Sequence, residues 1–137
     1  MGEPMKLAAL AALALAAAAA AAPAPDRPVR VGLAGDDLDA CLSDGEVTGL
    51  NPRGDNFLAV RAAPDAGARL LHRLGPRHRV HVCDEAAGGA WLGIVYSPPG
   101  EPDRDCNVGS PVESPRRYRG PCASGWVAAR YVTIVAG

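Results

Sequence analysis

The run Arg79-Val80-His81-Val82-Cys83, followed by Trp91-Leu92-Gly93-Ile94-Val95-Tyr96, decides the fold. In the first run the two valines alternate with Arg79, His81 and Cys83, and this period of two is typical of a β-strand. The segment between the runs contains Gly88 and Gly89, so it predicts a turn. Two short strands joined by a turn are therefore expected at the centre of the chain.

The remainder of the chain from Gly45 onward repeats this pattern of short apolar runs between turn residues. No window is long and periodic enough to predict a helix. We therefore predict an all-β domain of five to six short strands at residues 41–137. The expected strands are Glu46–Leu50, Phe57–Arg61, Arg69–Leu74, Arg79–Cys83, Trp91–Tyr96 and Val132–Val135.

The N-terminal region has the layout of a secretory signal peptide. A single basic residue, Lys6, precedes an unbroken apolar run from Leu7 to Ala22. The run is shorter than the roughly 20 residues that span a bilayer, so an uncleaved anchor is the weaker alternative. We predict a signal peptide at residues 1–21 and an exported protein, periplasmic or secreted, with no stable membrane span after cleavage. The proline-containing segment at residues 22–40 is predicted to be a flexible linker.

Four cysteines follow the apolar run, an even number that predicts two disulfides in an oxidising compartment. Three pairings are formally open. We favour Cys106 with Cys122, which closes a local loop, and Cys41 with Cys83, which ties the N-terminal segment to a central strand.

Cys83 and the nearby histidines are the candidate residues for a metal site or a catalytic site. The cysteine spacing lacks the C-x-x-C pairs typical of zinc sites, and a disulfide at Cys83 would remove the thiolate. His72, His78 and His81 are therefore interpreted as solvent-facing residues. Asp84 and Glu85 are adjacent and diverge, so they do not predict a hydrolytic carboxylate pair. We expect no metal, no cofactor and no enzymatic activity.

Five segments in a fixed order carry a resemblance to a known family: Leu58–Asp65, Leu70–Leu74, Arg79–Val82, Gly88–Val95 and Gly125–Val132. They resemble the bacterial SH3-like family, including its "Gly-x-Trp-x-x-Val" strand and its "Gly-Trp-Val-x-x-x-Tyr-Leu" finish. The resemblance implies a small barrel that binds peptidoglycan or its peptides and catalyses nothing. Residues 97–124 depart from the family as a proline-rich insertion that contains Cys106 and Cys122.

Aromatic and basic residues are the candidate ligand contacts. Tyr96, Trp126 and Tyr131 are expected to line a groove, because aromatic-lined grooves bind extended peptides in SH3-type domains. The alternative is that Trp91, Trp126 and Phe57 pack in the core or at its rim. Arg117 and Tyr118 belong to the densest basic cluster, Arg116 to Arg119, which is either a solvent-facing loop or a site for acidic groups.

The balance of acidic and basic residues bears on the kind of partner that the protein binds. The 137 residues contain 14 basic and 15 acidic side chains, giving a formal net charge of −1. This balance does not favour binding to nucleic acid. We expect a monomeric binding module whose partner is peptidoglycan or an envelope protein. The alternative is a small secreted inhibitor or regulator of an envelope enzyme that acts through the Cys106–Cys122 loop.

Overall fold

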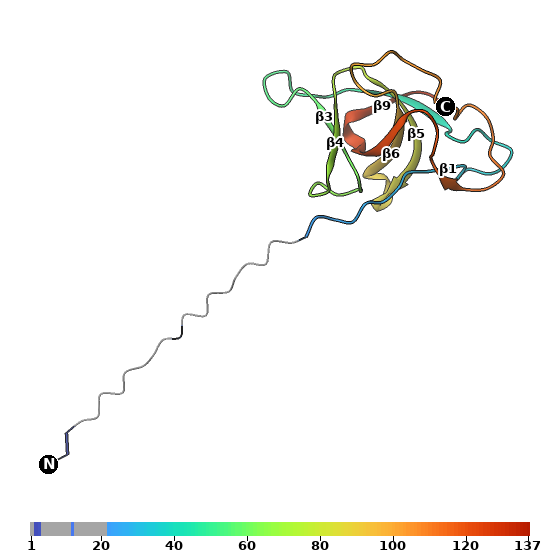
Figure 1. Ribbon diagram of the computed structural model, residues 1–137. Coiled ribbons are helices and arrows are strands. Elements are labelled where there is room, and N and C mark those ends of the chain that lie inside the picture. Colours follow the sequence, from blue (N-terminus) through green and yellow to red (C-terminus); the bar gives the residue numbers. More distant parts are fainter. Residues whose placement is uncertain (1, 4–11, 13–21) are drawn as a thin grey trace.

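The computed structural model describes residues 2–3, 12 and 22–137, and the chain between residues 22 and 137 is all-β, as predicted (Figure 1). Two short 3₁₀ turns, η1 (Ala87–Gly89) and η2 (Ala129–Tyr131), interrupt the strands. The strands are β1 (Arg30–Val31), β2 (Ser43–Val47), β3 (Leu58–Arg61), β4 (Leu70–Leu74), β5 (Arg79–Ala86), β6 (Trp91–Tyr96), β7 (Arg116–Arg117), β8 (Ala123–Ala128) and β9 (Val132–Ala136). The predicted signal peptide, residues 1–21, lies outside the described residues except for residues 2, 3 and 12.

Seven strands form one antiparallel sheet in the order β4-β3-β8-β6-β5-β2-β9. A closed barrel requires the two end strands to pair with each other, and β4 and β9 have no such pairing. The predicted barrel of five to six strands is thus corrected to an open seven-stranded sheet with a separate β1–β7 pair. The alternation of apolar and polar residues along a strand indicates which face of the sheet is buried, but it does not indicate whether the sheet closes into a barrel.

Two apolar clusters hold the domain together. The main cluster fills the concave side of the sheet: Val47, Leu58, Val60, Leu74, Val80, Ile94, Tyr96 and Val127. The second cluster lies between the sheet and the β1–β7 pair: Val31, Ala40, Cys41, Val95, Cys106 and Val108. Cys83 and Cys122 pack against the second cluster, so both disulfides belong to it.

Both predicted disulfide pairings are confirmed. Cys41 bonds Cys83 across 42 residues of sequence, and Cys106 bonds Cys122 across 16 residues. Disulfides form and persist in oxidising compartments, so the pairings indicate an environment outside the reducing cytosol. Among the described residues, no helix is long and apolar enough to cross a membrane.

The structure differs from the linker predicted at residues 22–40. Val29 and Val31 are only 2% and 3% exposed. The backbone N–H of Arg27 donates to the carbonyl oxygen of Ala62, and that of Arg30 donates to the buried carboxylate of Asp84. Residues 27–31, called the arm below, are thus part of the folded unit.

The arm covers the indole ring of Trp126. The ring Nε1–H donates to the carbonyl oxygen of Arg27 at 2.7 Å, and the Arg27 guanidinium lies 5.1 Å from the ring centroid. Beside it, Gly93 leaves room for Val29, because a Cβ at Gly93 would lie 3.1 Å from a Val29 methyl group. Trp126 is therefore buried by a segment that lies almost a hundred residues before it in the sequence.

Removing the arm is expected to destabilise the sheet. A chain that begins at Gly32 loses the burial of Val29 and Val31, which lowers the free energy of unfolding by roughly 3 kcal/mol. Its tryptophan emission shifts to longer wavelength, because water reaches Trp126. A chain that begins at Asp26 is the control and keeps the parent melting temperature and emission. Equal melting of the two truncated chains would contradict this role of the arm.

Candidate functional site

A cavity of about 680 Å³ lies at the end of the sheet where the β2–β3 loop, the β3–β4 loop and both 3₁₀ turns meet. Three half-buried aromatic rings line it, those of Phe57, Trp91 and Tyr131. We call this cavity the aromatic groove. Its other lining residues are Gly49, Leu50, Asn51, Asp55, Leu58, Ala59, Arg61, Ala66, Ala90, Ala128 and Arg130.

Backbone hydrogen bonds fix the walls of the groove. The N–H of Ala129 donates to the carbonyl oxygen of Ala90, and the N–H of Thr48 donates to that of Tyr131, both at 2.9 Å. Gly49 adopts a left-handed backbone (φ +73°) beside the Tyr131 ring, a conformation that glycine tolerates best. The ring of Tyr131 is therefore positioned by main-chain contacts on both sides.

Guanidinium groups lie against the aromatic rings. Arg130 lies over Tyr131 at 4.8 Å from the ring centroid, and Arg73 lies over Phe57 at 5.1 Å. Arg61, half-buried in the wall, donates a hydrogen bond from Nη1 to the carbonyl oxygen of Ala68. The groove thus combines flat apolar surfaces with fixed cations, which suits ligands that carry both apolar faces and carboxylates.

Of the three aromatic residues predicted to line a groove, Tyr131 lines the aromatic groove, Tyr96 borders a separate cavity beside β5, and Trp126 lies in the core. Tyr96 and Trp126 are core residues, at 1% and 0% exposure, and neither ring is accessible to a ligand. The Tyr96 hydroxyl is hydrogen-bonded to Nδ1 of His72 at 2.6 Å, and burial raises the pKa of Tyr96. Both rings stabilise the fold.

Phe57 and Trp91, expected in the core or at its rim, are half-buried and line the aromatic groove. Trp91 is the first residue of β6, directly after the η1 turn, and Phe57 immediately precedes β3. Side chains at strand ends lie beside loops, where binding residues concentrate. That end position is the sequence signal that could have identified both residues.

The other two candidate residues, Arg117 and Tyr118, line a separate cavity of about 570 Å³. It lies between β1, β7 and the loop that follows Cys106, and it shares no lining residue with the aromatic groove. We call it the arginine pocket. Its lining residues are Val31, Ala40, Asn107, Val108, Val112, Arg116, Arg117, Tyr118, Arg119 and Gly120.

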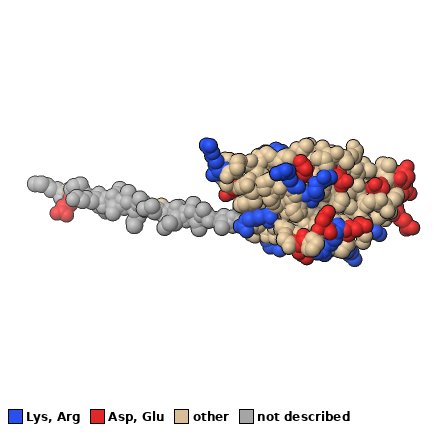
Figure 2. Space-filling model, turned by 90° about the horizontal axis from the view of Figure 1, so that it is seen from above, with Lys and Arg blue, Asp and Glu red and all other residues tan. Residues whose placement is uncertain are grey.

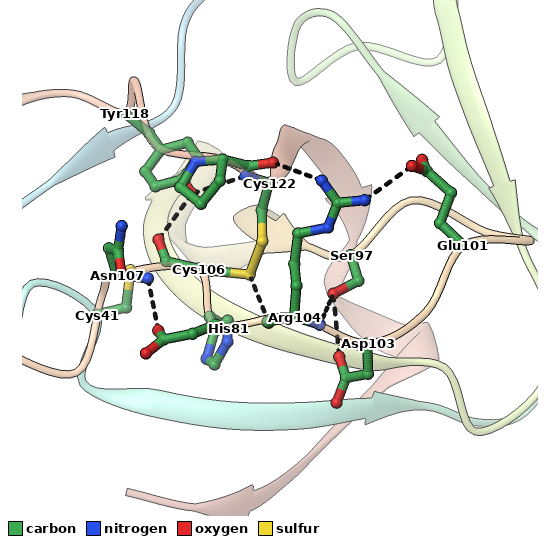
Figure 3. Close-up of a disulfide and its surroundings, with 12 residues drawn as sticks. Cys41, His81, Ser97, Glu101, Asp103, Arg104, Cys106, Asn107, Tyr118 and Cys122 are labelled. Carbon is green, nitrogen blue, oxygen red and sulfur yellow. Dashed lines mark hydrogen bonds and ion pairs between the residues drawn. A yellow bond between two sulfur atoms is a disulfide. The ribbon is translucent and has the colours of Figure 1, made fainter.

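The Tyr118 hydroxyl bridges the two halves of the Cys106–Cys122 disulfide (Figure 3). It donates to the carbonyl oxygen of Cys106 at 2.7 Å and accepts from the N–H of Cys122 at 3.1 Å. Burial raises the pKa of Tyr118; the Cys122 hydrogen bond lowers it, and the negative charge of Asp105 raises it further. Tyr118 therefore braces the stapled loop as a neutral phenol at physiological pH.

The histidines near Cys83 have separate partners. His78 is hydrogen-bonded to the backbone oxygen of Ser97, and His81 lies 2.6 Å from the carboxylate of Asp44. Cys83 is oxidised. Within the described part of the chain, no three His, Cys, Asp or Glu side chains are grouped so as to hold a metal ion.

No protein-family model, curated protein or solved structure matches the chain. The residue-level geometry therefore carries the functional argument.

Replacing Tyr118 with phenylalanine is expected to weaken the stapled loop. The change removes one donated and one accepted hydrogen bond, which lowers the free energy of unfolding by about 1–3 kcal/mol. Urea denaturation of the oxidised protein measures the loss. Tyr131→Phe is the matched control, since no hydrogen bond of the Tyr131 hydroxyl is found among the described residues, and it changes stability little. Equal losses in the two variants would refute the bracing role.

Proposed function

We propose that the protein is an exported, non-catalytic SH3-like binding module of the bacterial cell envelope, which recognises peptidoglycan or an envelope protein through the aromatic groove. The observation that carries the proposal is the set of three half-buried rings, Phe57, Trp91 and Tyr131, gathered around one cavity with Arg61 and Arg130. A concave site with apolar walls and a few convergent polar groups is typical of binding sites.

The SH3-like resemblance and the groove support each other. The resembling segments fall on β3, β4, β5, β6 and the β8–η2 region. Of these, β3, β6 and the β8–η2 region supply residues that line the groove. The resemblance implied an envelope ligand, and the two disulfides accord with export to an oxidising compartment.

The chemistry of the lining residues favours binding over catalysis. Among the described residues that line the groove, Asp55 is the one carboxylate, and the set contains no histidine, cysteine, serine or threonine. Hydrolysis of a glycosidic bond commonly uses two opposed carboxylates, and acyl transfer uses a nucleophile with a base. Stacking surfaces and cations instead suit a ligand with ring faces, amides and free carboxylates, all of which peptidoglycan presents.

The charge distribution accords with a neutral or mixed-charge target. Basic and acidic side chains are interspersed over the face seen in Figure 2, and the formal net charge is −1. A protein that binds a phosphate backbone gathers its basic residues on one face. The specificity of ligand binding would then depend on the side chains that line the groove and not on the overall charge of the protein.

Co-sedimentation with purified peptidoglycan sacculi tests the proposal. We expect the oxidised protein to be retained, and Arg130→Glu to reduce the retained fraction about tenfold, since it places a negative charge beside Tyr131 and repels ligand carboxylates. Trp91→Ala is expected to have a similar effect through lost stacking surface. Arg130 is exposed, so the charge reversal leaves the fold intact, and circular dichroism verifies this.

Arg117→Glu is the comparison variant, an equal charge reversal at the arginine pocket. Loss of retention in Arg130→Glu but not in Arg117→Glu supports the groove as the contact surface. Loss only in Arg117→Glu moves the peptidoglycan contact to the arginine pocket and overturns the groove as the contact surface. No retention of the parent protein removes peptidoglycan and leaves an envelope protein as the partner to be sought by crosslinking at the groove.

A further inference from the structure

The arginine pocket has an apolar floor and a cationic rim. Val31, Ala40 and Val108 form the floor and are nearly inaccessible to water as members of the second apolar cluster. The rim carries three arginines with exposed side chains: Arg116, Arg117 and Arg119. A cavity of about 570 Å³ lies within the size range of small-molecule sites.

The rim charges are not neutralised within the part of the chain that the structure describes. The ion pairs there are Arg69 with Asp26, His81 with Asp44, and Arg104 with Glu101. None of them involves a rim arginine. An anion at the rim would therefore meet available guanidinium groups without breaking an existing ion pair.

The β1–β7 pairing adds to this local positive charge. Arg117 lies directly opposite Arg30, and like charges in that relation disfavour strand pairing. Arg116 lies opposite Val31, on the side of the strand pair that forms the floor. The adjoining loop also carries acidic groups: Asp105, whose carboxylate already accepts the N–H of Asn107, and the exposed Glu113, which has no ion pair with a rim arginine among the described residues.

The pocket is rigid before any ligand binds. The Cys106–Cys122 disulfide and the Tyr118 hydroxyl fix the loop on one side (Figure 3). The N–H of Tyr118 also donates to the carbonyl oxygen of Val29, which ties this wall to the arm. A preorganised site loses little conformational entropy when a ligand binds, so the few contacts of a small ligand are enough for binding.

An anionic membrane surface fits this site less well than a single small molecule does. The loop between the floor residues Val31 and Ala40 carries Asp36, Asp37 and Asp39, all exposed. These carboxylates would face an approaching anionic bilayer and repel it. A monomeric ligand presents one carboxylate to the rim, whereas a bilayer presents anionic groups to the whole face, these carboxylates included.

We propose that the arginine pocket binds a monomeric amphiphilic carboxylate, with its alkyl part on the valine-lined floor and its carboxylate at Arg116 and Arg119. Guanidinium groups bind carboxylates through paired N–H donors, and removal of the ligand's own alkyl surface from water, against the half-buried Val112 and Tyr118, supplies the remaining affinity. The site is independent of the aromatic groove, so it stands whether or not the groove binds peptidoglycan.

Isothermal titration calorimetry of the oxidised protein with decanoate, below its micellar concentration, tests the proposal. We expect saturable binding with one site, at least tenfold tighter than that of decanol, which lacks the charge, and of acetate, which lacks the chain. The Arg116→Gln/Arg119→Gln variant is expected to bind decanoate about tenfold more weakly, because both charged contacts are removed. Arg53→Gln, an exposed arginine in the turn at residues 51–54, is the control and binds as the parent does.

A second readout separates a binding role from a structural one. The double variant is expected to melt at the parent temperature without ligand and to lose the rise in melting temperature that decanoate gives the parent. The proposal is overturned by non-saturable binding, by equal affinity for decanoate and decanol, or by equal decanoate affinity in the double variant and the parent. Binding to phosphatidylglycerol vesicles without saturable decanoate binding would also overturn it.

Discussion

The hydrogen bond from the Trp126 indole to the carbonyl oxygen of Arg27 is the contact on which the rest of the domain depends. It secures the arm over the centre of the sheet, where β8 pairs with both β3 and β6. With the arm in place, Val31 becomes the floor of the arginine pocket, and the oxygen of Val29 fixes the Tyr118 backbone. The docked arm thus accounts for both the burial of Trp126 and the floor of the second cavity.

The two cavities use the same principle in different ways. In each, a short arginine-bearing element, η2 in the aromatic groove and β7 in the arginine pocket, is fixed to the rest of the domain. The aromatic groove relies on the η2 turn, bonded through Ala129 and Tyr131. The arginine pocket relies on a disulfide and a phenol. A rigid sheet with variable, pinned loops separates stability from recognition, because loop side chains can change without loss of the core.

Local pattern predicted β2 to β6, β9 and the disulfides, but the list of expected strands lacked β1, β7 and β8. Non-local contacts account for much of what it missed. The alternation at Arg79–Cys83 and the apolar run at Trp91–Tyr96 identified β5 and β6, since period and composition are local properties. The arm escaped prediction because β1 has two residues and pairs with an equally short β7 more than eighty residues away. The sequence predicted Trp126 at a ligand groove because the arm that covers its ring has no strand pattern, so its burial could not be foreseen. The missing closure of the barrel likewise depends on how distant strands meet.

The long separation between the arm and β8 also constrains the order in which the domain can fold. Chains are synthesised from the N-terminus, and contacts between distant residues form late because their loop-closure entropy is large. The arm is available early, but its docking surface is absent until β8 has paired with β6. The part of the domain that is synthesised first therefore reaches its native position only after β8 has been added to the sheet.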